Sequence, residues 1–348
     1  MSLRRRTAYF AGSVLHAAGV FRLLHLRLLP ENVSVLMYHG VVGAPLPVPD
    51  WCFLPLSHFE EQMEYLTRHF DVVHLEEAFS SDSRGAGRPR ACVTFDDGFA
   101  SLHDLAVPIL ERLRIPATVY LVTDLVDSAD TVWFARLHQA ICETKASEVR
   151  ASGLRFPLAG KTARAEASAS LQVALKRLSR ADFAPVLEDV LRQLGFGGPQ
   201  RAKPWEPFRM LRSDEIRRMG RDGLVRFGAH TASHQILTRT TREDARGEIE
   251  RSVAALAALV ERPSRTFAYP NGGPDDYDDT VAGFVRGAGI EYAVTTIEGP
   301  NGLHVDPYAI RRYGIGSGDP LPRFAGLIHH ARDFPREIGR MLRRRRRS

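Results

Sequence analysis

Two adjacent carboxylates follow an apolar run at residues 91–95. The run reads as a buried strand, and Asp96, Asp97 and Gly98 come directly after it. Neighbouring carboxylates beside an apolar strand repel each other and resist loss of water, so a cation between them would remove a large cost. The simple structural alternative is an Asx-turn or a helix cap at Asp96, because Asp before Gly is common in turns.

Two histidines follow a second run of the same kind. Residues 224–229 form a predicted strand, and His230 and His234 come after it, four residues apart. Side chains at this spacing can converge on one point across a helical turn. An isolated pair of this kind is more often two loop residues than a metal site, but here it coincides with the aspartate pair at another strand end. Two His and one carboxylate are a recurrent ligand set for a catalytic divalent metal.

The two pairs together predict a division of roles at one metal centre. One aspartate would bind the metal, which neutralises it, and the other would stay free beside it as a base. A bound cation also lowers the pKa of a coordinated water towards roughly 7. This is the chemistry of a metal-dependent hydrolase.

Strands that alternate with helices must bring these residues together. Helical patterns occupy about 57–70, 242–260 and 278–286, and Ser57 and Thr240 are the expected caps of the first two. The alternation predicts an α/β fold with a parallel sheet, and nearly continuous apolar runs indicate strands covered on both faces. The runs are 33–38, 72–75, 91–95, 117–122, 224–229, 265–269, 292–295 and 308–315.

The alternation stops between about residues 125 and 204. That stretch is rich in Ala, Arg and Leu, and its leucines at 171, 175 and 178 have helical spacing. We interpret it as a helical insertion in a loop. Trp133, Phe134 and His138 near its start could line a sugar groove, but the core of the insertion is the favoured place for them.

The composition is that of a globular protein with basic ends. The chain has 348 residues and a net charge of +6, and arginine runs at 4–6 and 343–347 account for that excess. The basic tail is expected to be solvated, with no nucleic-acid partner. Cys52, Cys92 and Cys142 lack a Cys-x-x-Cys spacing, so a structural zinc knuckle and a disulfide framework are unsupported, which agrees weakly with a reducing compartment.

Residues 1–30 combine basic and apolar side chains. They imitate the start of a signal peptide, but charged residues and histidines interrupt any span long enough to cross a bilayer. An amphipathic helix on a membrane or on the domain fits better. We expect a protein in the cytoplasm or at the periphery of the inner membrane, touching lipid through this segment and the basic tail. Export to the periplasm is the alternative.

Several motifs resemble one known family. TFDDG and HTASH look like the first two motifs of the polysaccharide deacetylase (NodB-like) family, carbohydrate esterase family four, and VLMYHGV, FEEQMEYL, IPATVYLV and FAYPNGG agree with a large bacterial branch of it. The resemblance covers about 33–122 and 210–312. It implies a distorted (β/α) barrel of about seven strands and metal-dependent removal of acetyl groups, usually from N-acetylglucosamine in a glycan.

Positions that match the family motifs carry implied roles. Asp96 matches the catalytic base, and Asp97, His230 and His234 match the metal ligands. The backbone N–H of Asn271 would hold the oxyanion, and Asn271 and Tyr269 of the same motif are the implied substrate-binding residues. Zinc is the default metal for two His and one carboxylate, and nickel, cobalt and manganese are compatible.

The chain also departs from the family pattern. Ala268 stands where the family usually has an arginine that braces the catalytic aspartate, and the late strand EYAVTTIEG lacks the usual Asp and Trp. We predict a replacement brace at Arg312, with Arg311 as the alternative. We predict His39, at the end of the first strand, as the acid that protonates the leaving amine. His329 and His330 are rejected for that role, because their segment has helical spacing.

The predicted function is hydrolysis of N-acetyl groups of an acetylated glycan from the cell envelope or an exopolysaccharide. One alternative is an O-acetyl esterase, and another is a glycan-binding protein on the same fold without catalysis. Retention of Asp96 argues against the last, since binding does not require a base. The expected units are 1–30, a barrel in two halves at 31–124 and 205–322, the insertion at 125–204, and a C-terminal helix with the basic tail at 323–348.

Overall fold

A curved sheet of parallel strands forms the centre of the molecule. The computed structural model describes residues 19–29, 31–79, 88–197, 203–302, 304–335 and 337–338. Within these residues, neighbouring strands follow the spatial order β11 (Tyr292–Val294), β10 (Thr266–Ala268), β9 (Val225–Ala229), β6 (Ala117–Leu121), β5 (Arg90–Phe95), β1 (Val33–Tyr38) and β12 (Tyr313–Gly314), with β4 (Asp71–Val72) beside the start of β5.

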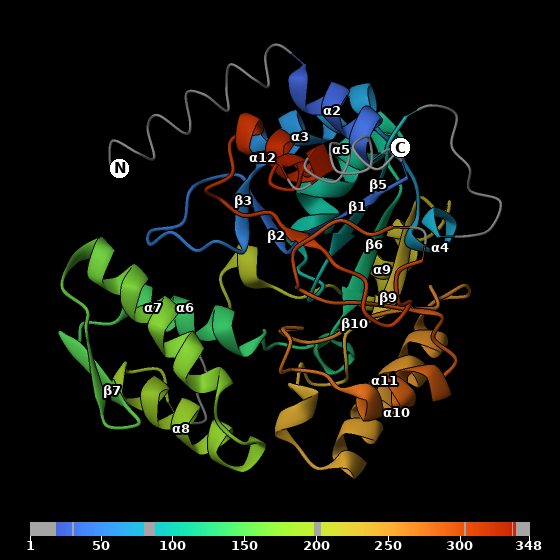
Figure 1. Cartoon of the computed structure of the whole chain (residues 1–348). Helices are drawn as coiled ribbons and strands as arrows, with labels where there is room; N and C mark the ends of the chain where they lie inside the picture. Colours follow the sequence, from blue (N-terminus) through green and yellow to red (C-terminus); the bar gives the residue numbers. More distant parts are fainter. Residues whose placement is uncertain are drawn as a thin grey trace.

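The sheet curves towards closure and is covered on its outer side. Ile310 forms a parallel bridge to Val294 of β11, while β12 pairs with β1, so one segment links the two edges of the sheet. All residues of β1 and β5 are buried, as predicted for strands with two covered faces. Around the strands lie α3 (Leu56–His69), α4 (Leu75–Ala78), α5 (Val107–Leu113), α9 (Ser213–Met219), α10 (Arg242–Leu259) and α11 (Asp279–Gly287) (Figure 1). The predicted distorted barrel is confirmed.

Some local predictions need correction. The predicted strand 72–75 is wrong, because β4 ends at Val72 and Leu75 begins α4. Ser57 does not cap α3, which starts at Leu56 without a side-chain cap. Thr241, one residue after the predicted Thr240, caps α10 by accepting a hydrogen bond from the N–H of Asp244.

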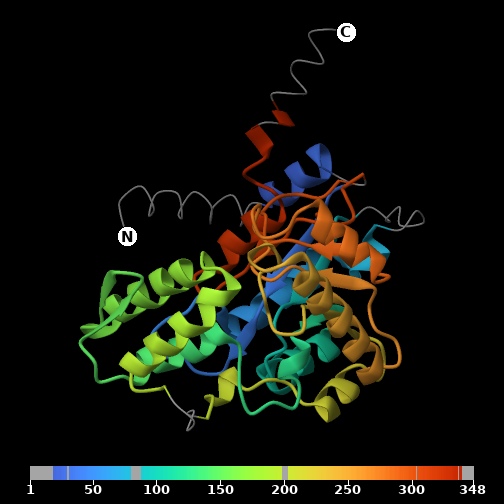
Figure 2. The ribbon, with the colours of Figure 1, turned by 90° about the horizontal axis from the view of Figure 1, so that it is seen from below.

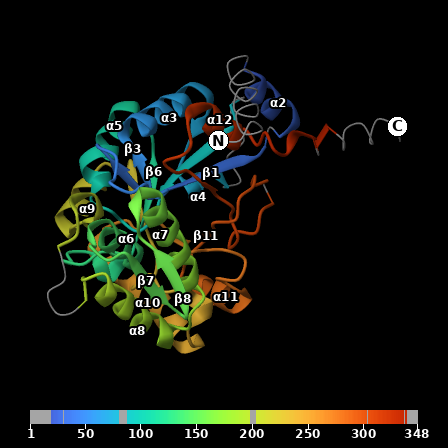
Figure 3. The same cartoon turned by 90° about the vertical axis from the view of Figure 1, so that its left-hand side faces the viewer.

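The insertion is a separate lobe with its own apolar core. Its helices are α6 (Trp133–Glu143), α7 (Gly160–Lys176) and α8 (Arg180–Gln193), and Figure 3 shows them on the side of the barrel nearest the viewer. The insertion is helical as predicted, but it also contains an antiparallel hairpin of β7 (Glu148–Ala151) and β8 (Leu154–Pro157), which was not predicted. Ser152 and Gly153 at its turn both have positive φ, as a tight two-residue hairpin requires.

The two ends of the described chain meet. α2 (Val20–Leu28) lies beside α12 (Leu321–Ile328), and Phe21 and His25 of α2 are buried there (Figure 2). α2 therefore packs on the domain, one of the two predicted places. No helix within the described ranges has the length and apolar character to cross a bilayer. Residues 1–18 and the run 343–347 lie outside the described residues, so the membrane contact and the location stay predictions.

Shorter elements complete the framework. β2 and β3 form a small parallel pair beside the end of β1, and a π-helical turn leads from the aspartate loop into α5. The remaining bounds are β2 (Gly40–Val42), β3 (Phe53–Pro55), η1 (Leu102–Ala106), η2 (Thr123–Leu125), η3 (Glu206–Phe208) and η4 (Leu237–Arg239).

Candidate active site

The carboxyl ends of neighbouring strands bring the predicted residues to one edge of the sheet. Asp96 and Asp97 follow β5, His39 follows β1, and His230 follows β9. Parallel strands end at a common edge, so these side chains meet although they are far apart in sequence. The turn after β5 is tight, since Asp97 has a φ of 72° and a Cβ on Gly98 would lie 2.7 Å from Cδ2 of Leu121.

Asp97, His230 and His234 form a group that could hold a metal ion. One ligand atom from each lies within 4.8 Å of the other two. Oδ1 of Asp97 is 3.2 Å from Nε2 of His234 and 3.6 Å from Nε2 of His230. Asp97 is 1% exposed, yet neither of its carboxylate oxygens has a hydrogen-bond partner in the described structure. An unpartnered buried carboxylate is costly, and a cation bound there would remove the cost.

The hydrogen bond of His230 determines which ring nitrogen faces that carboxylate. Nδ1 lies 2.7 Å from the carbonyl oxygen of Ala268, which can only accept, so Nδ1 carries the proton. Burial lowers the pKa of His230 to about 4, so the ring is neutral near pH 7 and Nε2 presents a lone pair. A lone pair facing a carboxylate repels it, whereas a cation between the two binds both. The residues present therefore fit a divalent metal.

The charge state of Asp97 also suits a ligand. Burial alone would raise the pKa of Asp97, but the nearby imidazoles of His234, His39 and His230 together lower that pKa to about 2. The carboxylate is thus ionised over the whole range in which the protein is expected to work.

Asp96 forms a buried, two-pronged ion pair with Arg312. Nη1 and Nη2 of Arg312 donate to the two Asp96 oxygens over 2.6 and 2.7 Å, and Nε donates to the carbonyl of Thr295 over 2.9 Å. Arg312 is 0% exposed. Burial would raise the pKa of Asp96, but the charge and hydrogen bonds of Arg312, together with the nearby imidazoles of His230 and His39, outweigh that effect and lower the pKa. The bracing geometry predicted for Arg312 is present, whereas Arg311 is exposed.

A cavity of about 140 Å³ opens over these residues; we call it the catalytic cavity. His39 lines it, half-buried, with its ring 4.9 Å from that of Trp51. Nδ1 of His39 lacks a hydrogen-bond partner in the described structure, and burial lowers the pKa of this histidine. Further lining residues are Met37, Asp96, Phe134, Gln172, Lys176, His230, His234, Asn271 and Thr296.

Asn271 lies at the cavity, but Tyr269 does not. Asn271 has a φ of 61°, and its carbonyl accepts a 2.6 Å hydrogen bond from Oγ1 of Thr296. Close approach of the backbone requires Gly272, since a Cβ there would be 2.9 Å from the carbonyl oxygen of Tyr269. The Tyr269 side chain is 0% exposed and its hydroxyl donates to the carbonyl of Tyr308. The prediction that Tyr269 contacts substrate is therefore wrong: it packs in the core.

Residues from the insertion also reach the site; this was one predicted alternative for Phe134 and was missed for Gln172 and Lys176. Phe134, Gln172 and Lys176 line the catalytic cavity. The favoured core placement holds in part: Phe134 is buried in an apolar cluster and also lines the catalytic cavity, whereas Trp133 is half-buried and lines a neighbouring cavity. His138 is buried, as favoured, with Nε2 3.0 Å from the carbonyl of Val48. Helical spacing could not reveal these contacts, because the insertion reaches the barrel only through tertiary packing.

Comparisons with known proteins identify the family and the fold. The family model described as polysaccharide deacetylase matches residues 83–293, more than half of the chain. No curated protein matches. Among solved structures, the deacetylase PplD of Streptococcus pyogenes, in complex with acetate, is 16% identical with a TM-score of 0.57, covering 85% of this chain and 98% of that chain.

Two further solved structures have the same fold. IcaB of Ammonifex degensii is 18% identical with a TM-score of 0.55, covering 86% of this chain and 97% of that chain. A de-N-acetylase of Aggregatibacter actinomycetemcomitans is 13% identical with a TM-score of 0.55, covering 85% of this chain and 99% of that chain. At these identities the likeness shows the fold, while the family match concerns the sequence itself.

Proposed function

The chain belongs to the polysaccharide deacetylase family and is a deacetylase hydrolase, and from this premise we propose that it removes N-acetyl groups from N-acetylglucosamine residues of a glycan. The observation that supports the proposal most is the unpartnered carboxylate of Asp97 facing two histidines beside the braced Asp96. A binding protein has no need of that second acid. The relative that is named a de-N-acetylase favours an amide substrate.

We propose that Asp97, His230 and His234 hold a divalent metal, with zinc as the default and nickel, cobalt or manganese as compatible ions. When bound, such an ion polarises an acetyl carbonyl and acidifies water. His230 is held for this role by the Ala268 carbonyl, which fixes its tautomer. The site thereby uses the backbone of the position where the family usually has an arginine.

Asp96 is the proposed base. It lines the catalytic cavity, and its carboxylate takes the proton of the attacking water. Arg312 holds that carboxylate in one orientation through two hydrogen bonds, so the accepting oxygen is positioned before substrate arrives. Arg312 is a positioning residue, because it acts through Asp96.

Two further groups complete the proposed reaction. The backbone N–H of Asn271, at the rim of the cavity, donates to the oxygen that becomes negative as water adds to the carbonyl. His39 lines the same cavity, and because burial lowers its pKa the imidazole would be neutral before the reaction. It would receive the proton that Asp96 has taken from the water and pass it to the nitrogen as the C–N bond breaks. Acetate and a free amino sugar are the products.

Acetate release from a substrate panel tests the proposal. The metal-loaded protein is expected to release acetate from N-acetylglucosamine oligomers, and chelation should stop the release until a divalent metal is restored. Asp96→Asn should lower kcat roughly 1,000-fold with metal content unchanged. Release from O-acetylated sugars only would favour the esterase alternative. Glycan binding without any release by the metal-loaded protein would favour the binding-module alternative.

A further inference from the structure

A second cavity adjoins the catalytic cavity, between the insertion and the barrel. Its volume of about 310 Å³ lies at the lower end of the range of ligand sites. We call it the insertion cavity. Its insertion wall includes Trp133, Lys176 and Phe183, and its barrel wall includes His234 and Arg239. His234 and Lys176 line both cavities, so a ligand that fills one is in contact with the boundary of the other.

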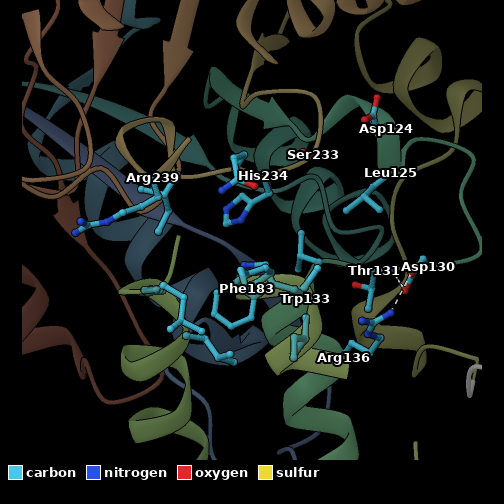
Figure 4. A pocket seen from close by; sticks show the side chains of 18 of the residues that line it. Asp124, Leu125, Asp130, Thr131, Trp133, Arg136, Phe183, Ser233, His234 and Arg239 are labelled. Atoms are coloured by element: carbon cyan, nitrogen blue, oxygen red, sulfur yellow. Dashed lines mark hydrogen bonds and ion pairs between the residues drawn. The ribbon is translucent and has the colours of Figure 1, made fainter. Parts of the chain in front are cut away.

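The insertion wall offers aromatic surface at a fixed angle. The rings of Trp133 and Phe183 are 5.2 Å apart and nearly perpendicular, so each holds the other in place. Figure 4 shows both rings across the cavity from His234. Aromatic faces pack against the apolar face of a sugar ring, and the volume corresponds to roughly ten waters, which accommodates a sugar unit.

The cations of the two walls differ in how they are neutralised. Arg136, also in the lining, donates to Glu188 over 2.9 Å and lies 3.4 Å from Asp130, so its charge is balanced. Lys176 has no carboxylate partner in the described residues, and Nε of Arg239 is buried without a hydrogen-bond partner. Both side chains are half-buried at the cavity wall, and no carboxylate of the described residues balances their charges, which leaves room for an anion from a ligand.

The acidic lining residues do not fill that role. Asp130 and Glu188 are the partners of Arg136. Asp124 is exposed and lies on the opposite side of the cavity from Arg239 (Figure 4). Lys176 lines both cavities, so its uncompensated charge lies where the insertion cavity meets the catalytic cavity, while that of Arg239 lies on the barrel wall.

We propose that the insertion cavity binds the sugar unit next to the one that is deacetylated, and that this unit carries a negative charge. Trp133 and Phe183 contact its ring, while Lys176 and Arg239 contact its anionic group. The inference rests on the proposed function, because it takes the catalytic cavity as the place of the N-acetylated sugar. A carboxylate of a uronic acid and a phosphate ester share the required chemistry.

Matched oligosaccharides test the charge preference. The acidic probe alternates N-acetylglucosamine with glucuronic acid, a second probe carries a phosphate ester on the neighbouring sugar, and the neutral probe is an N-acetylglucosamine oligomer of equal length. We expect kcat/KM to be about 10-fold higher for one acidic probe than for the neutral one, with the difference shrinking in high salt. Whichever acidic probe shows the gain identifies the anion.

Substitutions of the two cations test whether they cause the preference for an acidic probe. Lys176→Gln and Arg239→Gln should each reduce the acidic-to-neutral ratio of kcat/KM by about 5- to 10-fold. The matched control is Lys161→Gln, an exposed residue on the same helix, about 22 Å from Lys176 along the axis, which should leave the ratio unchanged. An equal fall for acidic and neutral probes, or a wild-type ratio near one for both acids, overturns the proposal.

A binding measurement separates this proposal from the proposed function. Calorimetry of the metal-loaded Asp96→Asn protein with the fully deacetylated acidic probes needs no catalysis. Binding that weakens about 10-fold in Asp96→Asn/Arg239→Gln supports the charged subsite even if the intact protein releases no acetate, in which case only the deacetylase proposal fails. Equal binding of neutral and acidic probes overturns the subsite while leaving the deacetylase proposal intact.

Discussion

Two groups of buried histidines lie at opposite ends of the barrel, and they are built differently. His230 and His234, the metal-centre histidines, follow β9 and face the carboxylate of Asp97. That carboxylate has no hydrogen-bond partner in the described structure. The group is therefore incomplete without a cation.

The other group consists of His25, His329 and His330, which we call the basal histidines. Nδ1 of His330 lies 2.7 Å from the hydroxyl of Tyr313, and Nδ1 of His25 lies 3.1 Å from Nδ1 of His329. Nε2 of His329 lies 3.0 Å from the hydroxyl of Tyr65 and Nε2 of His330 lies 3.2 Å from Oγ of Ser34. The side-chain partners named here are hydroxyls and other histidines of the group, and no carboxylate is among them.

The difference shows what separates a ligand histidine from a structural one. His230 is as buried as the basal histidines and the side chain of His234 is only 10% exposed, so burial alone does not distinguish the groups. What distinguishes them is the unpartnered carboxylate of Asp97, which lies close to Nε2 of both metal-centre histidines and which a bound cation would satisfy. The rejection of His329 and His330 as the catalytic acid agrees with their place at the basal end.

The largest expected effect comes from removing one histidine of each group. His230→Ala should abolish metal binding and lower kcat/KM roughly 1,000-fold, since several kcal/mol of transition-state stabilisation depend on the metal. His330→Ala should keep metal and kcat but lower the free energy of unfolding by about 2 kcal/mol, because the buried hydroxyl of Tyr313 loses its partner. Metal analysis, acetate release and urea denaturation measure the three quantities. Loss of metal in His330→Ala would contradict the proposed difference between the metal-centre histidines and the basal histidines.

Variants of Arg312 test whether the buried carboxylate of Asp96 destabilises the protein when its ion-pair partner is removed. Arg312→Met should lower the free energy of unfolding by about 4 kcal/mol, because Asp96 is then a buried charge without compensation. The double variant Arg312→Met/Asp96→Leu should recover most of that loss and remain inactive. Urea denaturation of the single and double variants gives the comparison. Equal stability of the two would mean that the pair is not coupled.

A variant of His39 tests whether the proton donor is distinct from the metal ligands in the active site. His39→Ala should lower kcat about 100-fold, as expected for loss of a general acid, without changing metal content. Acetate release and metal analysis are the measurements, with thermal denaturation as the folding control. Full activity in a folded protein would dispose of the proposed role.

The smallest effect is a pH dependence of stability carried by the basal histidines. Burial lowers the pKa of His25 to about 4, so between that value and its ordinary pKa of about 6.5 the unfolded chain binds more protons than the folded one. His25 therefore causes no loss of stability above about pH 6.5, and the free energy of unfolding falls as the pH decreases from there towards 4. The loss from this one group at pH 5 is about 2 kcal/mol.

Urea denaturation between pH 7 and pH 5 measures this loss. His25→Phe removes the titrating group and keeps a ring between Phe70 and His329, so its stability should vary less with pH. A variant with the same pH dependence as the original chain would show that other groups carry it.

Much of the barrel could be predicted because each of its main strands is a short apolar run that is visible in the local sequence. β1 matches the predicted run 33–38 residue for residue, and β5 and β6 differ by one residue at one end. The hairpin β7–β8 was missed because its four-residue strands have one buried face and mixed composition, which is also typical of loops. The cap of α10 was displaced by one residue because Thr240 and Thr241 are both suitable caps.

The sequence by itself determined which residue types could form the metal centre, because TFDDG and HTASH each place their side chains directly after a strand. Only the tertiary structure decided the brace and the second cavity. Arg312 meets Asp96 across more than two hundred residues, and Lys176 reaches the catalytic cavity from the insertion. The physical reason is that spacing along a chain constrains neighbours in a strand or helix, whereas ion pairs and cavities depend on how distant segments pack.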